Sequence, residues 1–137
     1  MSQFNWTLHI TNGGLRICRN KKVKNKQKTS SIANEIMQND DCMYDHIDRN
    51  PLNNQKNNLR SCTWAQNSAN TSKRKGSCTS KYKGVYLNKK NNKWKAAICI
   101  DYVSYHLGTF DTEEAAAKAY DIAAIKAFKE FANLNFK

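Results

Sequence analysis

The sequence lacks any long apolar run. Only 39% of its 137 residues are hydrophobic, and no segment approaches the roughly 20 consecutive apolar residues that would span a bilayer. Residues 1–6 also lack the charged region, apolar stretch and small-residue cleavage site of a secretory signal. So little apolar material excludes the large core of an extended α/β enzyme. We therefore expect a soluble, intracellular chain of one or two small domains that binds no membrane.

Paired cysteines are also missing. Five cysteines stand at positions 18, 42, 62, 78 and 99, and none forms a C-x-x-C pair. An odd number at such wide spacing fits neither a disulfide framework nor a zinc knuckle. We expect reduced thiols and no zinc.

Acidic residues are few, at 11 Asp plus Glu against 23 Lys plus Arg, so the formal net charge is +12. Such an excess points to nucleic acid or an anionic membrane, and the sequence has no basic amphipathic helix for the membrane. Residues 81–106 hold six lysines and a single aspartate. Charge gathered on one segment predicts a binding face for a polyanion.

The first 80 residues predict short elements. Apolar alternation and a turn at residues 12–14 predict a hairpin within residues 1–20, and the basic run 21–28 predicts a long loop. Ser30 or Ser31 is expected to cap a helix that ends at Met37. Small polar residues and charges over 71–80 predict a linker.

The last 57 residues have a regular pattern. Alternation predicts strands over 82–87, 94–101 and 105–110. Asp111 with Glu114 three positions later predicts a capping box and a helix to about Phe131. The expected buried stripe of that helix consists of Ala116, Ala119, Tyr120, Ala123, Ala127 and Phe131. This part is predicted to be a three-stranded antiparallel sheet packed on one helix.

A first motif lies between these parts. Residues 45–60 read D-H-I-x-x-N-P-L-x-N-x-x-x-N-L-R, and Gln66-Asn67 follows. A hairpin with His46 on its first strand, Asn58 at the start of its second and Asn67 on a following helix would bring the three side chains together. The segment resembles the HNH endonuclease family, which has a ββα-metal fold.

The chemistry of these residues fits phosphodiester hydrolysis. That reaction needs a base for the attacking water and a cation to neutralise the phosphate, and histidine titrates near neutral pH. Asp45 and Asn67 offer the hard oxygen ligands that suit Mg²⁺ or Mn²⁺. The resemblance implies that Asp45 and Asn67 bind the metal, that His46 activates water and that Asn58 holds the loop orienting His46. Lys56 and Arg60 are candidate phosphate contacts.

A second resemblance covers residues 81–137. Y-x-G-V, W-x-A-x-I, L-G-T-F, A-A-x-A-Y-D and N-F occur in that order, and the segment resembles the plant Apetala-two/ethylene-response-factor DNA-binding domain. The resemblance implies that the sheet lies in the DNA major groove. If Trp94, Ala96 and Ile98 face the helix, the opposite sheet face carries the DNA contacts. The candidate contacts there and at its rim are Lys83, Tyr86, Asn88, Lys90, Lys93, Lys95, Ala97, Cys99 and His106.

The sheet segment contains no arginine from residue 81 onward. Lysine attracts phosphate as a point charge and lacks the planar fork that arginine offers to guanine. We therefore expect affinity for double-stranded DNA with modest base selectivity.

Together these patterns predict an α+β chain: a ββα-metal HNH module with an N-terminal hairpin in residues 1–70, a linker in 71–80 and the sheet domain in 81–137. The expected function is that of a homing-type or free-standing endonuclease that uses Mg²⁺ or Mn²⁺. One such site acts on one strand, so a monomer or weak dimer should nick DNA, wherever in the cell its target lies. The alternatives are a catalytically silent DNA-binding or regulatory protein and a basic RNA-binding protein.

Overall fold

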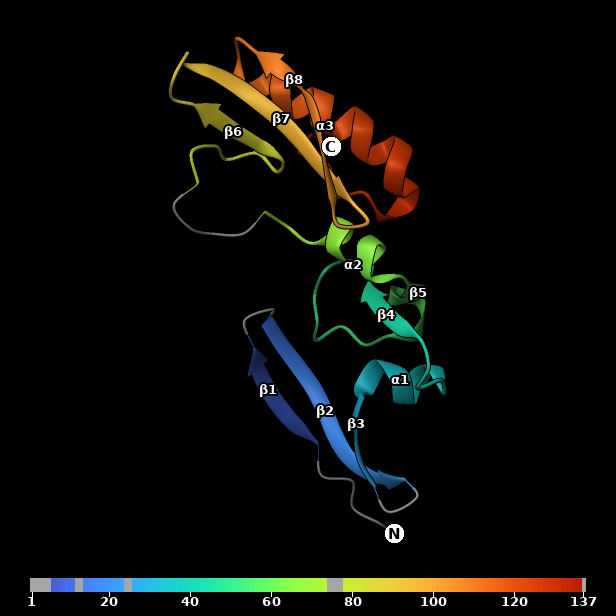
Figure 1. The fold of residues 1–137 in the computed structure, drawn as a ribbon. Coiled ribbons are helices and arrows are strands. Elements are labelled where there is room, and N and C mark those ends of the chain that lie inside the picture. Colours follow the sequence, from blue (N-terminus) through green and yellow to red (C-terminus); the bar gives the residue numbers. More distant parts are fainter. Residues whose placement is uncertain (1–5, 12–13, 24–25, 74–77, 137) are drawn as a thin grey trace. The chain divides into compact units, whose positions relative to one another are not determined.

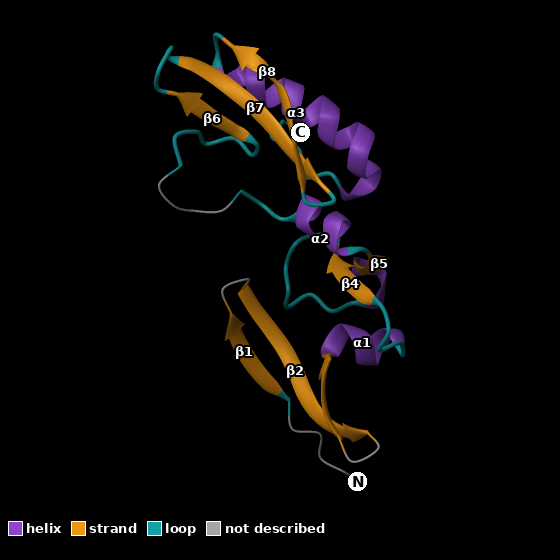
Figure 2. Ribbon diagram, in the orientation of Figure 1, coloured by secondary structure: helices purple, strands orange, loops and turns teal. Residues whose placement is uncertain are grey.

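The computed structural model describes residues 6–11, 14–23, 26–73 and 78–136. The chain forms two compact units, residues 1–64 and 65–137, and each is described by itself. The described residues form an α+β fold with antiparallel sheets, and Figure 2 shows their helices and strands. No helix in these described ranges is both long enough and apolar enough to cross a bilayer.

The first unit begins with a three-stranded sheet of order β1-β2-β3. The strands are β1 (Thr7–Thr11), β2 (Gly14–Val23) and β3 (Lys26–Ser31), drawn in blue in Figure 1. Pairing of β1 with β2 confirms the predicted hairpin, and most of its predicted turn, residues 12–13, lies outside the described residues.

The prediction of a long loop over residues 21–28 is wrong. Lys21 pairs with Lys28, and Lys22 pairs with Gln27, in the β2–β3 ladder. Antiparallel pairing satisfies the backbone N–H and C=O groups whatever the side chains are. A hairpin of polar residues can therefore form without the apolar alternation from which a strand is predicted. Residues 24–25, between the two strands, lie outside the described residues.

A short helix follows as predicted. Helix α1 (Ile32–Met37) starts at the N-cap Ser31, whose side chain accepts a 3.2 Å hydrogen bond from the Asn34 N–H. Arg19 on β2 holds Glu35 of this helix through a 2.6 Å ion pair. The helix ends at Gln38, whose φ of 55° is left-handed.

The motif segment folds as two strands and a helix. Strand β4 (Met43–His46) pairs antiparallel with β5 (Leu59–Cys62), a 3-10 turn η1 (Lys56–Asn58) precedes β5, and helix α2 (Trp64–Asn70) follows it. The predicted hairpin and following helix are confirmed as elements. From Ala65 onward α2 belongs to the second unit, and the predicted domain limits at 70 and 81 stay predictions.

The second unit contains the predicted sheet on one helix. Strands β6 (Val85–Asn88), β7 (Lys93–Ile100) and β8 (Val103–Phe110) form an antiparallel sheet, and α3 (Glu113–Phe128) covers one face of it before the 3-10 turn η2 (Lys129–Phe131) (Figure 1). Val85, Ala96, Ala116 and Ala117 make a tight core at this contact. Small side chains let the helix axis approach the sheet closely.

Two details of α3 differ from the prediction. The N-cap is Thr112, which accepts a 3.2 Å hydrogen bond from the Ala115 N–H, so the predicted Asp111–Glu114 capping box is wrong. The predicted buried stripe is confirmed at Ala116, Tyr120 and Phe131 and is wrong at Ala127, which is exposed. The buried helix residues are Ala116, Ala117, Tyr120, Asp121, Ala124 and Phe128. Alanine is so frequent in this helix that apolar spacing alone gives little directional signal.

Gly84, directly before β6, allows a close contact with Tyr120 of α3. Its φ is +74°, and a Cβ there would come within 2.0 Å of the Tyr120 ring. Glycine avoids both the left-handed strain and the clash. Burial, with the neighbouring Asp121 charge, raises the pKa of Tyr120 to about 12.

Candidate functional site

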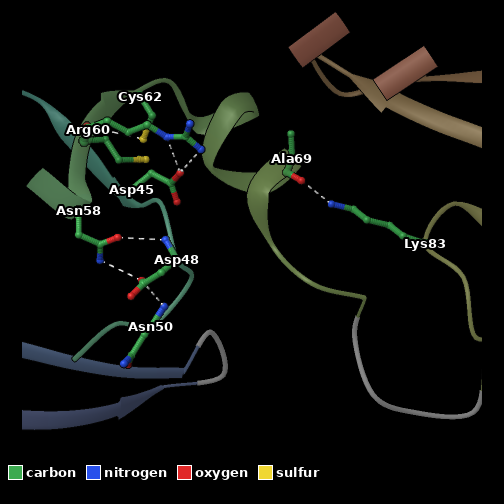
Figure 3. A network of polar contacts seen from close by, with 9 residues as sticks. Asp45, Asp48, Asn50, Asn58, Arg60, Cys62, Ala69 and Lys83 are labelled. Carbon is green, nitrogen blue, oxygen red and sulfur yellow. Dashed lines mark hydrogen bonds and ion pairs between the residues drawn. The ribbon is translucent and has the colours of Figure 1, made fainter. Parts of the chain in front are cut away.

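The predicted metal ligand Asp45 and the predicted phosphate contact Arg60 form an ion pair. They lie opposite each other in the β4–β5 register, and the Arg60 Nε and Nη2 atoms donate to Asp45 Oδ2 at 3.1 and 2.9 Å (Figure 3). Asp45 is 5% exposed. Burial of a carboxylate in contact with a guanidinium makes each group depend on the other for charge compensation.

Cys62 lies near this pair (Figure 3). Burial raises the pKa of the Cys62 thiol to about 11, and the Asp45 charge adds to the shift. The thiol is therefore neutral at physiological pH, and it is a poor nucleophile in that form.

His46 ends β4 and is held by Asn54. The two side chains meet at 3.1 Å between His46 Nε2 and Asn54 Oδ1. The Asn54 amide nitrogen donates to the Pro51 and Leu52 carbonyls, both at 3.3 Å, which fixes the amide oxygen toward the histidine. An amide oxygen only accepts, so this contact is a hydrogen bond in the tautomer that carries its hydrogen on Nε2.

Asn58 organises the loop after His46. Its buried side chain accepts a 3.1 Å bond from the Asp48 N–H and donates to Asp48 Oδ1 at 2.9 Å and to the Asn53 carbonyl at 2.8 Å (Figure 3). The Asn50 N–H and the side chains of Asn53 and Asn58 hold the pKa of Asp48 below its usual value. Asn58 thus lies against the loop that follows the histidine, and its predicted role in orienting His46 stays a prediction.

Sequence reasoning gave no role to Asn54 or Asp48. Asn54 is a fixed letter of the motif, four residues before Asn58, and that position was the available signal. Asp48 falls on a variable letter, so its part in the loop emerges only from the fold.

The remaining predicted nuclease residues lie on other elements. Asn67 is on α2, and Lys56 is exposed in η1. Among the described residues, no group of three His, Cys, Asp or Glu side chains could hold a metal ion. The pairing of Asp45 with Asn67 on a metal stays a prediction.

In the second unit, register confirms the predicted exposed face of the sheet. Tyr86 lies opposite Lys95, Asn88 opposite Lys93, and His106 opposite Ala97. Ala96 and Ile98, at 0% and 3% exposure, face the helix. The face that carries Lys95, Ala97 and Cys99 therefore points away from α3, and we call it the outer sheet face.

Two residues of the outer sheet face were missed. Thr109 pairs with Lys95, and Ser104 pairs with Cys99. A bulge shifts the register between Ala96 and Ala97, so the alternation of β8 changes phase before Thr109. Ser104 lies two residues before His106 on the same strand, so simple alternation places both on the outer sheet face and would have identified Ser104.

The lysines around the sheet have different surroundings. Lys95 lies in β7, and Lys90 is exposed in the turn before it. Lys93 Nζ makes a 2.9 Å ion pair with Asp111, and both side chains are well exposed. Exposed pairs of this kind contribute about 0–1 kcal/mol, so a phosphate could displace Asp111. Lys83 differs, because its Nζ contacts the carbonyl of Ala69 at 2.6 Å (Figure 3).

Comparison with known proteins identifies the second unit. Residues 80–130 match the family described as "AP2 domain". These residues are an AP2 domain. An ethylene-responsive transcription factor-like protein of Arabidopsis thaliana is 48% identical over 48 residues, which is 35% of this chain and 20% of that protein. An AP2/ERF and B3 domain-containing protein of Oryza sativa subsp. japonica is 45% identical over 58 residues, 42% of this chain and 16% of that one.

A further relative extends beyond the AP2 domain. An uncharacterized HNH endonuclease of Acanthamoeba polyphaga mimivirus is 40% identical over 95 residues, 69% of this chain and 48% of that protein. The chain thus spans about half the length of this relative. The two resemblances read from the sequence are confirmed, and they support an architecture that joins an HNH part to an AP2 domain.

Proposed function

We propose that this chain is a metal-dependent DNA endonuclease of the HNH type, homing or free-standing, whose AP2 domain binds duplex DNA. The observation that carries the proposal is the histidine at the end of β4. Its Nε2 meets Asn54 Oδ1 at 3.1 Å, and the loop beside it is fixed by Asn58. The similarity to an uncharacterized HNH endonuclease supports the same reaction class.

In this proposal His46 is the general base. Nδ1 takes the proton of a water as the water's oxygen attacks phosphorus, and the bond to the leaving ribose oxygen breaks. Asn54 keeps the ring in the required tautomer and stabilises the imidazolium through its amide oxygen. Asn58 acts through the 47–54 loop and is a positioning residue.

The donor set fits a hard divalent cation. Asp45 supplies a carboxylate and Asn67 an amide oxygen, and Mg²⁺ is commonly held by one or two such groups with water and substrate phosphates in the remaining positions. Zinc in such a site prefers His and Cys ligands. A bound Mg²⁺ or Mn²⁺ would neutralise charge on the phosphate and the leaving oxygen. Arg60 compensates the buried charge of Asp45, and Lys56 is free to approach the DNA backbone.

The outer sheet face is the proposed DNA contact surface. It presents Lys95 and His106 beside Tyr86, with Lys90 and Lys93 at its rim. Lysines attract the backbone without reading bases, so the affinity should fall steeply with salt and vary little with sequence. A monomer of this design nicks duplex DNA, and it acts wherever in the cell its target lies.

A nicking assay tests the proposal. Purified chain is incubated with supercoiled plasmid and Mg²⁺ or Mn²⁺, with EDTA added to a matched sample. We expect relaxed circles that form with metal and stop forming with EDTA. Absence of nicking across metals and DNA sequences would reject the nuclease.

One observation favours a second candidate, a catalytically silent DNA-binding or regulatory protein. The Asp45 carboxylate, the proposed metal ligand, is already engaged by Arg60 at 2.9 Å. A protein of this kind would bind DNA with the same salt dependence whether or not metal is present, and it would leave plasmid intact.

A further inference from the structure

The C-terminal end of α2 is uncharged and partly buried. The helix reads W-A-Q-N-S-A-N, has no basic residue in its last turn, and buries Ala69 and Asn70. The last carbonyls of a helix have no partner within it and favour a cation. The sequence of α2 provides none.

Lys83 of the AP2 domain supplies that cation. Its Nζ donates to the carbonyls of Ala69 at 2.6 Å, Thr71 at 2.8 Å and Ser68 at 3.4 Å. The ammonium therefore lies at the end of α2 with three backbone acceptors around it, and Figure 3 shows its contact with Ala69. Three acceptors match the three donors of an ammonium group.

Other contacts join the same two segments. The Asn133 backbone N–H donates to the Ala69 carbonyl at 3.4 Å, and its side chain donates to the Thr71 carbonyl at 3.1 Å. Lys73, beyond the helix, donates to the Tyr82 carbonyl at 2.6 Å. The end of α2 and the segment after it are thus hydrogen-bonded to residues near the start of the AP2 domain, Tyr82 and Lys83, and to Asn133 just after its end.

The backbone that carries Lys83 is itself fixed. Asn135 accepts the Lys83 N–H at 2.7 Å and donates to the Lys83 carbonyl at 3.1 Å. Asn135 is held in turn by the buried carboxylate of Asp121, through its own N–H at 2.9 Å and its side chain at 3.0 Å. These bonds fix the backbone from which the Lys83 side chain starts, so only the side chain itself must be ordered to make its contact.

We propose that Lys83 is a positioning residue that fastens α2, and Asn67 with it, to the AP2 domain, and that it is not a DNA contact. This rests on the proposed nuclease function in so far as Asn67 serves the metal. The AP2 domain, which binds DNA in this proposal, would then also carry α2 and its metal ligand Asn67. Binding of the AP2 domain to DNA would therefore determine the position of Asn67 on the DNA. The sequence-based prediction of Lys83 as a DNA contact assigns the same ammonium a different partner.

The test uses the full chain and three lysine variants. Lys83→Met keeps the aliphatic stem and removes the charge, Lys95→Met removes a proposed DNA contact, and Lys126→Met is the control on an exposed position of α3. Affinity for duplex DNA is measured by anisotropy in EDTA, and single-turnover nicking is measured at saturating DNA. Hydrogen exchange reports on residues 64–71.

For Lys83→Met we expect the affinity to stay within about twofold of wild type and the saturating nicking rate to fall about 10-fold or more, the scale of a misplaced catalytic group. The amides of residues 64–71 should exchange faster. Lys95→Met should instead weaken binding, and Lys126→Met should change none of the three. Lys83→Arg keeps a cationic donor and should lie closer to wild type than Lys83→Met.

A loss of affinity in Lys83→Met that matches Lys95→Met, with unchanged exchange in residues 64–71, would overturn the proposal and restore the DNA-contact role. If wild type does not nick DNA, the nuclease proposal fails separately. The exchange and affinity measurements then still decide whether Lys83 anchors α2.

Discussion

Replacement of Arg60 by methionine tests whether the Asp45–Arg60 pair is a buried, mutually dependent unit. The Arg60 side chain is 17% exposed, the Asp45 side chain is 6% exposed, and the two are joined at 2.9 Å. Methionine retains much of the aliphatic volume but leaves the Asp45 carboxylate buried without its guanidinium. Removal of one partner of a buried pair costs about 3–5 kcal/mol.

Native-state hydrogen exchange in the β4–β5 ladder measures this cost locally, without assuming that both units unfold together. A cost of about 3–5 kcal/mol corresponds to a two to four orders of magnitude faster exchange, up to the limit set by global unfolding. Lys56→Met, at an exposed position of the same segment, serves as the control and should leave the rates unchanged. The double variant Asp45→Asn with Arg60→Met removes the stranded charge and should recover much of the protection.

An increase below about tenfold in Arg60→Met would mean that the pair contributes less than about 1.4 kcal/mol, the range of a solvent-screened surface pair. That result would refute our reading of Asp45 as a buried carboxylate that depends on Arg60. It would also remove the observation that favours the silent binder.

Three further predictions concern the AP2 domain. Lys95→Ala should weaken binding to all DNA sequences alike and reduce the salt slope by about one unit; a loss confined to one sequence would contradict non-specific contact. Asp121→Ala leaves the N–H groups of Asn135 and Phe136 without their carboxylate acceptor. The free energy of unfolding in urea should fall by about 3–5 kcal/mol, since each hydrogen bond to a charged group contributes about 1.5–3 kcal/mol. A loss near zero would mean that water replaces the carboxylate as acceptor. The pKa of Tyr120 is raised to about 12 from an ordinary 10, so the unfolded chain loses this proton at lower pH than the folded chain. The free energy of unfolding should therefore fall as pH rises from about 10 to about 12. Tyr120→Phe should flatten this fall, measured as the urea midpoint against pH, and a pH profile equal to that of wild type would contradict the assignment.

The sheet and its faces could be predicted because alternation over β7 is strict. Because only one face of the sheet is buried, the apolar Ala96 points to the helix and Lys95 points outward. The register with the neighbouring strands is constrained by the same pattern. Alternation could not predict Thr109, since the register shift between Ala96 and Ala97 changes the phase of β8 before it. Ala127 was wrongly placed on the buried face of α3 because alanines on several sides of the helix fit more than one rotation, and packing against the sheet selects one.

In the first unit the motif letters predicted more than the periodicity did. His46 and Asn58 lie at the positions the motif implied, although residues 44–60 show no apolar repeat. The β2–β3 hairpin was missed because its cross-strand partners are lysines and polar residues, which carry no pattern of burial. The contact of Lys83 with α2 could not be read from the sequence either, because it depends on which unit receives the helix.

The most direct test of the account is metal-dependent nicking of supercoiled plasmid by wild type beside His46→Ala, with DNA affinity measured on both. We predict that wild type nicks with Mg²⁺ or Mn²⁺ and stops with EDTA, and that His46→Ala loses cleavage while its affinity for DNA stays nearly intact. Equal cleavage by the two proteins would remove His46 from its role as the base, and no cleavage by either would contradict the proposed nuclease.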